Sequence, residues 1–319
     1  MNLFSKSVIA SFAIIAFSCN KENDTNASSK TTTTAAITTA TPKKFLFDAT
    51  KAETAGNADW VLDADSSPQR FPTPAQSNVT ASTTESFWRG ALSSWGIALA
   101  KLGHTVETLP SGTAITYGGT GVQDLKNYDV FVVDEPNTRF TAVEKTAILK
   151  FVQNGGGLFM ISDHTISDRN NDGWDSPAIW NDLMSTNTVK TNAFGITITL
   201  NNFSETTTNR LSTTTNPILN GSQGVVTNLK YSNGASMSIN TVANPTAQGL
   251  IWRGSSSQGT SNIMCASATF GTGRVFVIGD SSPADDGTGA TGDTLYPGWT
   301  ELASHSRLHM NASLWLAKL

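Results

Sequence analysis

The sequence predicts an α/β fold in which helices cover both faces of a mostly parallel β-sheet. Four short apolar runs each end at an acidic residue or just before an Asp-His pair, and uninterrupted apolar runs of this length are typical of parallel strands buried on both faces. Segments with helical spacing separate several of these runs, which indicates strand-helix-strand crossovers. The four runs are 45–47 before Asp48, 130–133 before Asp134, 158–161 before Asp163 and 275–279 before Asp280.

The first residues predict an export signal rather than part of the fold. Lys6 precedes a short apolar stretch, and small residues lead to Cys19. This arrangement resembles a bacterial lipoprotein signal, with residues 1–18 removed and Cys19 lipidated; a plain secretory signal is the alternative. The residues after Cys19 resemble the export tag of Bacteroidetes-type surface lipoproteins, so we expect a lipid-anchored protein exposed on the outer membrane. The anchor would be the protein's only membrane contact.

The next segment, residues 19–43, is rich in Thr and Ser and cannot bury a core, so we expect a tether. Residues 44–319 then form a single domain. The net charge of -4 and the absence of a Lys/Arg cluster give no reason to expect a nucleic-acid-binding surface. Once Cys19 is lipidated, Cys265 has no disulfide partner, and its apolar surroundings predict an inert core residue.

The N-terminal half of the domain shows three expected strands and two helices. A long Pro-containing loop, 49–82, follows the first strand and is expected to cover a binding site. Thr84 is a candidate N-cap and Gly103 a C-cap for one helix, and Thr141 with Glu144 forms a capping box for the other. The expected strands are 44–48, 104–109 and 130–134, and the helices 85–102 and 141–153, the latter with Val143, Ile148, Phe151 and Val152 on one face.

The C-terminal half is expected to extend the same sheet. Gly155, Gly156 and Gly157 end the preceding helix and lead into the strand before Asp163. A helix is expected over 177–184, with Pro177 in its first turn. Residues 186–262 alternate apolar and polar side chains in places and predict added strands. The last strand is 274–279 and the closing helix 300–317.

A family resemblance rests on three segments. The run from Phe140 to Phe159 is similar to the helix, triple glycine and strand of the class I glutamine amidotransferase-like superfamily. Segments 216–221 and 271–280 resemble its ThuA-like and uncharacterised secreted branches. The resemblance implies a flavodoxin-like three-layer sandwich, with extra β-strands inserted in the C-terminal half. No cysteine stands where amidotransferases carry their nucleophile, so glutaminase activity is not implied.

The acids at the strand ends predict a catalytic site. In open α/β sheets the ligand crevice lies beyond the carboxyl ends of the strands. We expect Asp48, Asp163, His164 and Asp280 to meet there, with a divalent metal of unknown identity that activates water. The alternative is that several of these residues only cap helices and orient loops.

A second acidic stretch predicts calcium. Asp168, Asn170, Asp172 and Asp175 place oxygen side chains at alternating positions around Gly173, as calcium loops do. The glutamate expected at the twelfth position is absent, so the loop is not an EF-hand. A polar loop held by its own Asx turns is the alternative.

A serine nucleophile is the rival hypothesis for catalysis. Ser281 or Ser282 follows Asp280, and His164, His305 or His309 would act as the base. A serine-capped turn is the commoner structure for this motif.

Side chains expected to bind substrate flank the strand ends. Tryptophan rings stack on sugars, and Trp174 and Trp299 are expected to be exposed. Glu135 and Asp285 are the expected polar contacts.

The sequence thus favours a surface-anchored, secreted, metal-assisted hydrolase that acts on an extracellular carbohydrate or phosphoester. Two alternatives remain open: a non-catalytic glycan-binding lipoprotein with structural calcium, and a serine esterase.

Overall fold

The computed structural model describes residues 41–64 and 74–319. The expected signal peptide, Cys19 and most of the expected tether lie outside the described residues. Residues 40–319 form one compact unit. In the described part of the chain, no helix is long and apolar enough to cross a membrane.

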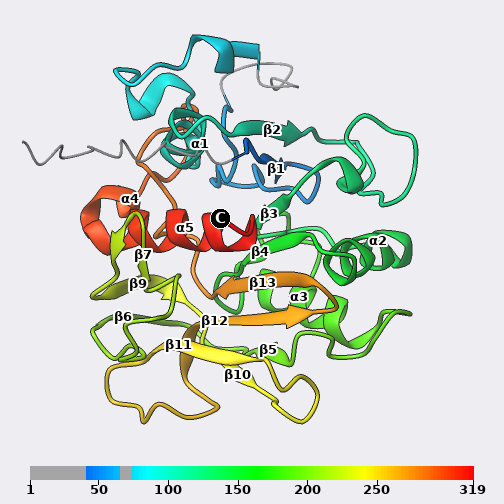
Figure 1. The fold of residues 1–319 in the computed structure, drawn as a ribbon, viewed down its shortest axis with the longest axis vertical. Helices are drawn as coiled ribbons and strands as arrows, with labels where there is room; N and C mark the ends of the chain where they lie inside the picture. Colours follow the sequence, from blue (N-terminus) through cyan, green and yellow to red (C-terminus); the bar gives the residue numbers. More distant parts are fainter. Residues whose placement is uncertain (1–40, 65–73) are drawn as a thin grey trace, which may run out of the picture. The chain divides into compact units, whose positions relative to one another are not determined.

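A nine-stranded sheet is the middle layer of the described structure (Figure 1). Its first five strands are mutually parallel and occupy one half of the sheet. The order from one edge is β2 (Thr105–Leu109), β1 (Lys44–Asp48), β3 (Val130–Asp134), β4 (Gly157–Ile161), β13 (Gly273–Ile278), β12 (Ile263–Phe270), β10 (Met237–Ile239) and β5 (Ile196–Ile198), with β11 (Gln248–Trp252) also paired to β12.

Helices cover both faces of this sheet. On one face, α1 (Ser93–Lys101) and α5 (Ala303–Leu316) pack through residues such as Trp95 and Leu308. On the other, α2 (Ala142–Gln153) and α3 (Ser176–Ser185) bury Ile148 and Trp180. Figure 1 shows α5 lying across the sheet. The flavodoxin-like three-layer arrangement with a mostly parallel sheet and added antiparallel strands is therefore confirmed.

Short elements complete the chain. The 3₁₀ helices are η1 (Pro74–Asn78), η2 (Glu85–Phe87) and η3 (Leu125–Asn127), and α4 (Gly298–Glu301) precedes α5. Four more strands form two small sheets of their own, which corrects the expectation that all added strands join the main sheet. These strands are β6 (Phe203–Thr207) with β9 (Leu229–Gly234), and β7 (Asn220–Gly221) with β8 (Gly224–Val225).

The helix and glycine run that precede β4 form as predicted. The Thr141 side chain accepts a hydrogen bond from the Glu144 amide, and the Glu144 carboxylate accepts one from the Thr141 amide, a complete capping box. Gly155 has a φ of +115° after α2 ends. A Cβ on Gly157 would lie 2.7 Å from the Leu316 carbonyl oxygen, so glycine lets β4 pass close to α5.

Two expected helices are broken by tertiary contacts. The predicted helix 85–102 consists of η2 and α1, and Thr84 makes no side-chain cap. Between η2 and α1, a Cβ on Gly90 would lie 2.3 Å from the Val61 carbonyl oxygen. Gly90 therefore packs directly against the backbone of residues 61–63. The predicted helix 300–317 is divided by Leu302, which is extended (φ -126°, ψ 127°).

One residue predicted to be buried is exposed, and one strand was not predicted. Val143 is 72% exposed, so it does not belong to the buried face of α2. The apolar run around Cys265 forms the long strand β12, which was predicted only as part of the core and not as a strand. Its antiparallel neighbours β11 and β13 explain why the run is buried.

Candidate functional site

Three of the predicted acids meet at the carboxyl edge of the parallel strands. Glu135 follows β3, Asp163 follows β4, and Asp280 follows β13. Because β3, β4 and β13 are neighbours and run in the same direction, their ends lie together. All three carboxyl groups are buried, with at most 3% of each residue exposed.

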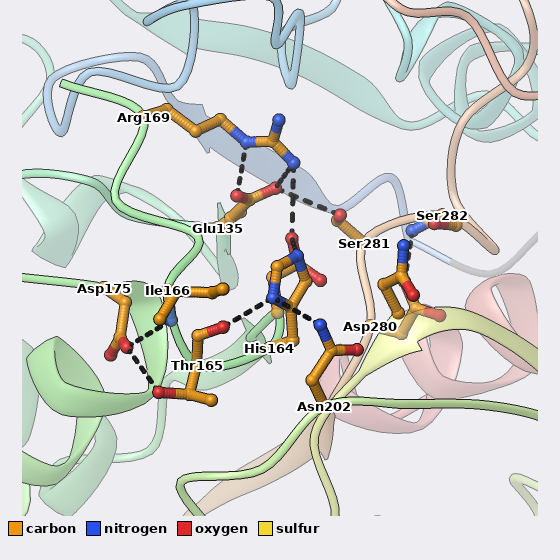
Figure 2. A network of polar contacts seen from close by, with 12 residues as sticks. Glu135, His164, Thr165, Ile166, Arg169, Asp175, Asn202, Asp280, Ser281 and Ser282 are labelled. Atoms are coloured by element: carbon orange, nitrogen blue, oxygen red, sulfur yellow. Dashed lines mark hydrogen bonds and ion pairs between the residues drawn. The ribbon is translucent and has the colours of Figure 1, made fainter. Parts of the chain in front are cut away.

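Arg169 binds the centre of this group (Figure 2). Its Nε lies 2.5 Å from Glu135 Oε1 and its Nη2 lies 3.0 Å from Oε2, a bidentate ion pair. The same Nη2 lies 3.2 Å from Asp163 Oδ2. Ser281 Oγ donates a hydrogen bond of 3.1 Å to Glu135 Oε2. One guanidinium therefore joins the ends of β3 and β4, and Ser281 links the end of β13 to them through Glu135.

The backbone at Glu135 is strained. Its φ of +41° is uncommon for a residue with a side chain, and such strain persists only where the surroundings enforce it. Here the Glu135 amide donates to the Ile161 carbonyl at 3.1 Å, and Asn137 Nδ2 donates to the Glu135 carbonyl at 2.8 Å. Asn137 Oδ1 also accepts from the Arg169 amide at 2.9 Å, so the same turn holds both partners of the ion pair.

The pKa of Asp163 is raised well above its ordinary value. Burial is the main cause, the carboxylates of Glu135 and Asp280 raise the pKa further, and Arg169 partly lowers it. Burial likewise raises the pKa of Asp280 to about 6, against hydrogen bonds from the Ser282 and Ser232 amides. Asp163 is therefore a carboxyl group with a raised pKa, next to the ion-paired carboxylate of Glu135.

Asp134 adds a further acid behind this group. Neither of its carboxyl oxygens has a hydrogen-bond partner, although the residue is 1% exposed. Burial raises its pKa well above the ordinary value, and Glu135, Asp285 and Asp280 add to the effect. The protonated form is the one that such a site stabilises.

His164 is the open edge of the site. Its side chain is 18% exposed, and its Nε2 lies 3.8 Å from Asp163 Oδ2. Its Nδ1 lies 2.6 Å from the Thr165 carbonyl oxygen and 3.1 Å from Asn202 Nδ2. A partly exposed imidazole thus lies in front of a buried carboxyl group whose pKa is raised.

The loop after β1 also contacts Arg169. Asn57 Oδ1 accepts a hydrogen bond of 3.0 Å from Arg169 Nη1, and the guanidinium lies 5.8 Å from the ring centre of Trp60. Trp60 is 2% exposed, so it supports Arg169 from inside. This is the loop that the sequence predicted to cover a binding site.

Asp48 lies apart from the other predicted site residues. Leu46 belongs to the core on the α2 face, so Asp48, two residues further along the strand, points to that face. The Asp48 carboxyl group interacts with Thr50, Glu53 and Lys51, and burial raises its pKa to about 6. The structure does not bring Asp48 together with Asp163, His164 and Asp280.

The expected calcium loop is held by its own turns. Asp168 accepts hydrogen bonds from the amides of Asp172 and Gly173, at 3.0 and 2.8 Å. Asp172 accepts from the Trp174 amide, and Asn170 from the Asp172 amide. Asp175 caps α3 through the Ala178 amide at 2.9 Å. These contacts fit the Asx-turn alternative.

The metal predictions gain no support from the arrangement of the side chains. Within residues 41–64 and 74–319, no group of three or more His, Cys, Asp or Glu side chains is placed so that it could hold a metal ion. The acids at the strand ends do not fit a metal because Arg169 already occupies the oxygens of Glu135 and Asp163. Calcium in the loop and a catalytic metal both remain predictions.

The two candidate serine nucleophiles donate their hydrogen bonds to acceptors other than histidine. Ser281 is 1% exposed and donates to Glu135, while Ser282 Oγ donates to the Ser232 carbonyl at 3.2 Å. His305 uses both ring nitrogens, since Nδ1 lies 2.7 Å from the Gly298 carbonyl and Nε2 accepts from the Lys230 amide at 3.1 Å. His309 is buried, which lowers its pKa to about 3.

Most of the side chains expected to contact substrate are buried or partly buried in the protein. Trp299 is 6% exposed and stacks on Trp95, so it belongs to the core and the prediction of exposure was wrong. Trp174 is half-buried beneath Arg139, whose guanidinium lies 3.9 Å from the ring centre. Asp285 is 1% exposed and accepts from the amides of Gly287 and Tyr296. Neighbouring protein groups therefore hold the side chains of Trp299, Trp174 and Asp285 in place without a ligand.

Arg169 is the functional residue that the sequence reading missed. It is the one Lys or Arg between Gly155 and Asp175, in a stretch with four acidic residues. A single cation among acids that follow a buried strand was a usable signal, because buried carboxylates need a counter-charge. The calcium-like spacing drew attention to its neighbours instead.

Comparisons with known proteins give no family and no activity. No protein-family model and no curated protein matches the chain. Among solved structures, the chain is similar to the N-terminal domain of mmIFT52 at 14% identity and a TM-score of 0.49, over 86% of this chain and 97% of that one. It is also similar to a thua-like protein from Bacteroides uniformis at 11% identity and a TM-score of 0.44, over 87% and 93% of the two chains. No functional conclusion follows from similarity at this level.

Proposed function

We propose that the protein is a hydrolase in which His164 exchanges protons with the substrate and Asp163 supports it. The observation that carries this proposal is the pairing of a partly exposed imidazole with a buried carboxyl group of raised pKa, 3.8 Å away. Perturbed carboxyl groups next to a histidine are the usual means of acid-base catalysis at neutral pH.

The proton path follows from which atoms are accessible. His164 Nε2 accepts a proton from a water molecule as the water oxygen attacks the substrate. The imidazolium that forms lies beside Asp163 and the ion-paired Glu135, whose negative charge stabilises it. The same Nε2 then returns the proton to the leaving oxygen. Arg169 keeps Glu135 in place and does not take part in proton transfer.

A neutral carbohydrate fits this site better than a phosphoester. Glu135 and Asp163 already engage the guanidinium of Arg169, and the carboxyl groups of Asp134 and Asp280 interact with this acidic group. A phosphate group would meet carboxyl groups without a free cation, and its desolvation would not be offset. The proposed substrate is therefore an extracellular glycan, which agrees with the predicted position on the cell surface.

The test is turnover of neutral glycans by the purified protein and by His164→Gln. The expected result is a loss of kcat of about 10²- to 10⁴-fold, the usual contribution of a general acid-base group. His104→Gln is the matched control, because His104 lies before β2, at the opposite end of the strands, and its Nδ1 accepts from the Lys43 amide. Equal turnover in wild type and His164→Gln would overturn the proposal.

Non-catalytic glycan binding is the second candidate. It is favoured by the burial of Glu135 and Asp163, which are 0% and 3% exposed and satisfied by protein partners. In that case no glycan is turned over, and His164→Gln weakens binding alone. Isothermal titration with the same glycans separates the two candidates.

Metal assistance is a separate question with its own measurement. Elemental analysis of the wild type beside an Asp163→Ala, His164→Ala double variant tests it. A transition metal or Mg²⁺ that copurifies with the wild type and is absent from the variant would support metal assistance. Equal metal content in the two proteins would contradict it.

A further inference from the structure

The backbone immediately after His164 adopts a rare conformation. Ile166 has a φ of +68° although it is β-branched, and its side chain is 80% exposed. A β-branched residue in this region is an outlier. Its exposed side chain has little packing with which to hold the turn, so a polar contact must do so.

Asp175 supplies that contact (Figure 2). Its Oδ2 accepts hydrogen bonds from the Ile166 amide at 2.8 Å and from Thr165 Oγ1 at 3.1 Å. Its Oδ1 accepts from the Ala178 amide at 2.9 Å and so caps α3. One carboxylate therefore attaches the turn after His164 to the first turn of a buried helix.

The planar peptide bond carries this constraint to His164. In a trans peptide, the Thr165 carbonyl and the Ile166 amide point in opposite directions. When Asp175 holds the amide, the carbonyl points the other way, and its oxygen lies 2.6 Å from His164 Nδ1. Because a carbonyl oxygen only accepts, Nδ1 must carry the proton.

Asn202 is compatible with the same tautomer. Its side-chain amide lies 3.1 Å from His164 Nδ1, and the oxygen and nitrogen of an amide are nearly interchangeable in position. With its oxygen toward the ring, Asn202 is a second acceptor for the Nδ1 proton. The neutral imidazole then has its lone pair on Nε2, the atom that faces Asp163.

We infer that Asp175 is a positioning residue for His164, which fixes the Nδ1-protonated tautomer through the Thr165–Ile166 peptide. The inference rests on the proposed function for its catalytic consequence: Nε2 is the atom that accepts the proton in that reaction. The tautomer itself exists without substrate and is measured separately.

The experiment is nitrogen NMR of the full chain with ¹⁵N-labelled histidine, at a pH where His164 is neutral. Two-bond couplings distinguish the tautomers. Asp175→Ser retains an N-cap acceptor for α3 but loses the second oxygen that holds Ile166. The expected result is a fall of about tenfold in the ratio of the Nδ1-H to the Nε2-H form, equivalent to one charge-assisted hydrogen bond.

Asp124→Ser is the matched control. Asp124 also caps a helix, η3, and accepts from loop amides, those of Gly118 and Gly119. It precedes β3 and so lies near the opposite end of the strands, and the tautomer ratio of His164 is expected to stay unchanged. Circular dichroism establishes that both variants are folded. If Asp175→Ser fails to fold, Asp175→Asn replaces it, because one amide oxygen cannot both cap α3 and hold Ile166.

The outcomes separate this inference from the proposed function. An unchanged ratio in a folded Asp175 variant overturns the positioning role, whatever happens to activity. A shifted ratio in a protein that turns over no glycan supports the positioning role and leaves the proposed function refuted. If the wild type is active, a shifted ratio with a drop of about tenfold in kcat and little change in KM supports both.

Discussion

Two acidic regions lie within a few residues of each other and behave differently. In the loop 168–175, Asp168 and Asp172 are at least partly exposed and accept hydrogen bonds from backbone amides. At the strand ends, Glu135 and Asp163 are buried and share one guanidinium. The first region is a set of Asx turns, whereas the second contains Asp163, whose pKa is raised by burial and by neighbouring carboxylates.

The difference shows that the role of an acidic side chain depends more on its hydrogen-bond donors and its burial than on its spacing in the sequence. A carboxylate that accepts backbone amides at the surface stabilises a turn and loses little hydration. A carboxyl group buried beside other carboxyl groups pays for desolvation and keeps its proton. Sequence spacing predicted calcium for the first region, but the chemistry is concentrated in the second.

The largest expected effect comes from removal of the shared cation. Arg169→Met leaves Glu135 buried without a counter-charge and should lower the free energy of unfolding by about 3–5 kcal/mol. Arg139→Met is the control, because Arg139 is half-exposed and pairs with Asp182 at 3.6 Å, an interaction expected to contribute less than about 1 kcal/mol. Urea unfolding measures both, and losses of equal size would contradict the comparison.

The pH dependence of stability tests the raised pKa values. A carboxyl group whose pKa is raised in the folded state binds more protons there than in the unfolded chain, so stability is lost as pH rises through the folded pKa. Between the ordinary carboxyl pKa and the raised pKa of the folded state, the free energy of unfolding should fall by about 1.4 kcal/mol per pH unit for each such group. The lowered pKa of buried His309 acts in the opposite direction, so the effect of one carboxyl group is read from a variant that lacks it.

Asp163→Asn identifies one of these groups, because the pKa of Asp163 is raised well above its ordinary value. The variant should have a shallower slope over the pH range in which the folded protein still binds the Asp163 proton and the unfolded chain does not, by up to one proton's contribution. Urea unfolding across this range measures the slope. Equal slopes in the wild type and the variant at every pH would rule out a raised pKa for Asp163.

A smaller effect is expected where the loop begins. Ile166→Gly removes the cost of a positive φ and should raise the free energy of unfolding by about 1 kcal/mol, less the backbone entropy that glycine adds. Val143→Gly is the matched control: it is β-branched and 72% exposed, but it is helical, so its loss should destabilise the protein by about 0.5 kcal/mol. Thermal unfolding compares them, and effects of the same sign would refute the strain.

The smallest effect is expected inside the loop. Asp168→Asn removes one acceptor for the amides of Asp172 and Gly173 and should cost about 0.5–1 kcal/mol. The same variant tests calcium: a melting temperature that rises with added Ca²⁺ in the wild type, and not in Asp168→Asn, would support the predicted ion. If added Ca²⁺ changes the melting temperature of neither the wild type nor Asp168→Asn, the Asx-turn alternative is favoured.

The parallel half of the fold could be predicted because its signals are local. The strands β1, β3, β4 and β13 are uninterrupted apolar runs, and α2 carries its capping box in sequence. The breaks at Gly90 and Leu302 could not be predicted, since they depend on contacts with distant segments. For example, the Ser94 amide in the first turn of α1 donates to Asp286 Oδ2 at 2.7 Å, and Asp286 is far away in the chain.

The candidate site was predictable in position but not in composition. Strand ends on one edge identified Asp163, His164 and Asp280. Asp48 was grouped with them because a strand end alone does not say to which face a side chain points. The ion pair with Arg169 depends on how the loop folds back over β3, which no local pattern records.

The position of β13 has a consequence for how the protein matures. This strand lies between β4 and β12, yet it is the last strand in the chain, and it brings Ser281 to the Glu135 carboxylate. Pairing it with β4 closes a long loop, a slow step in folding. A chain that is cut or still incomplete before β13 would therefore have most of its helices and no complete site, so activity would report on completed folding rather than on the presence of the chain.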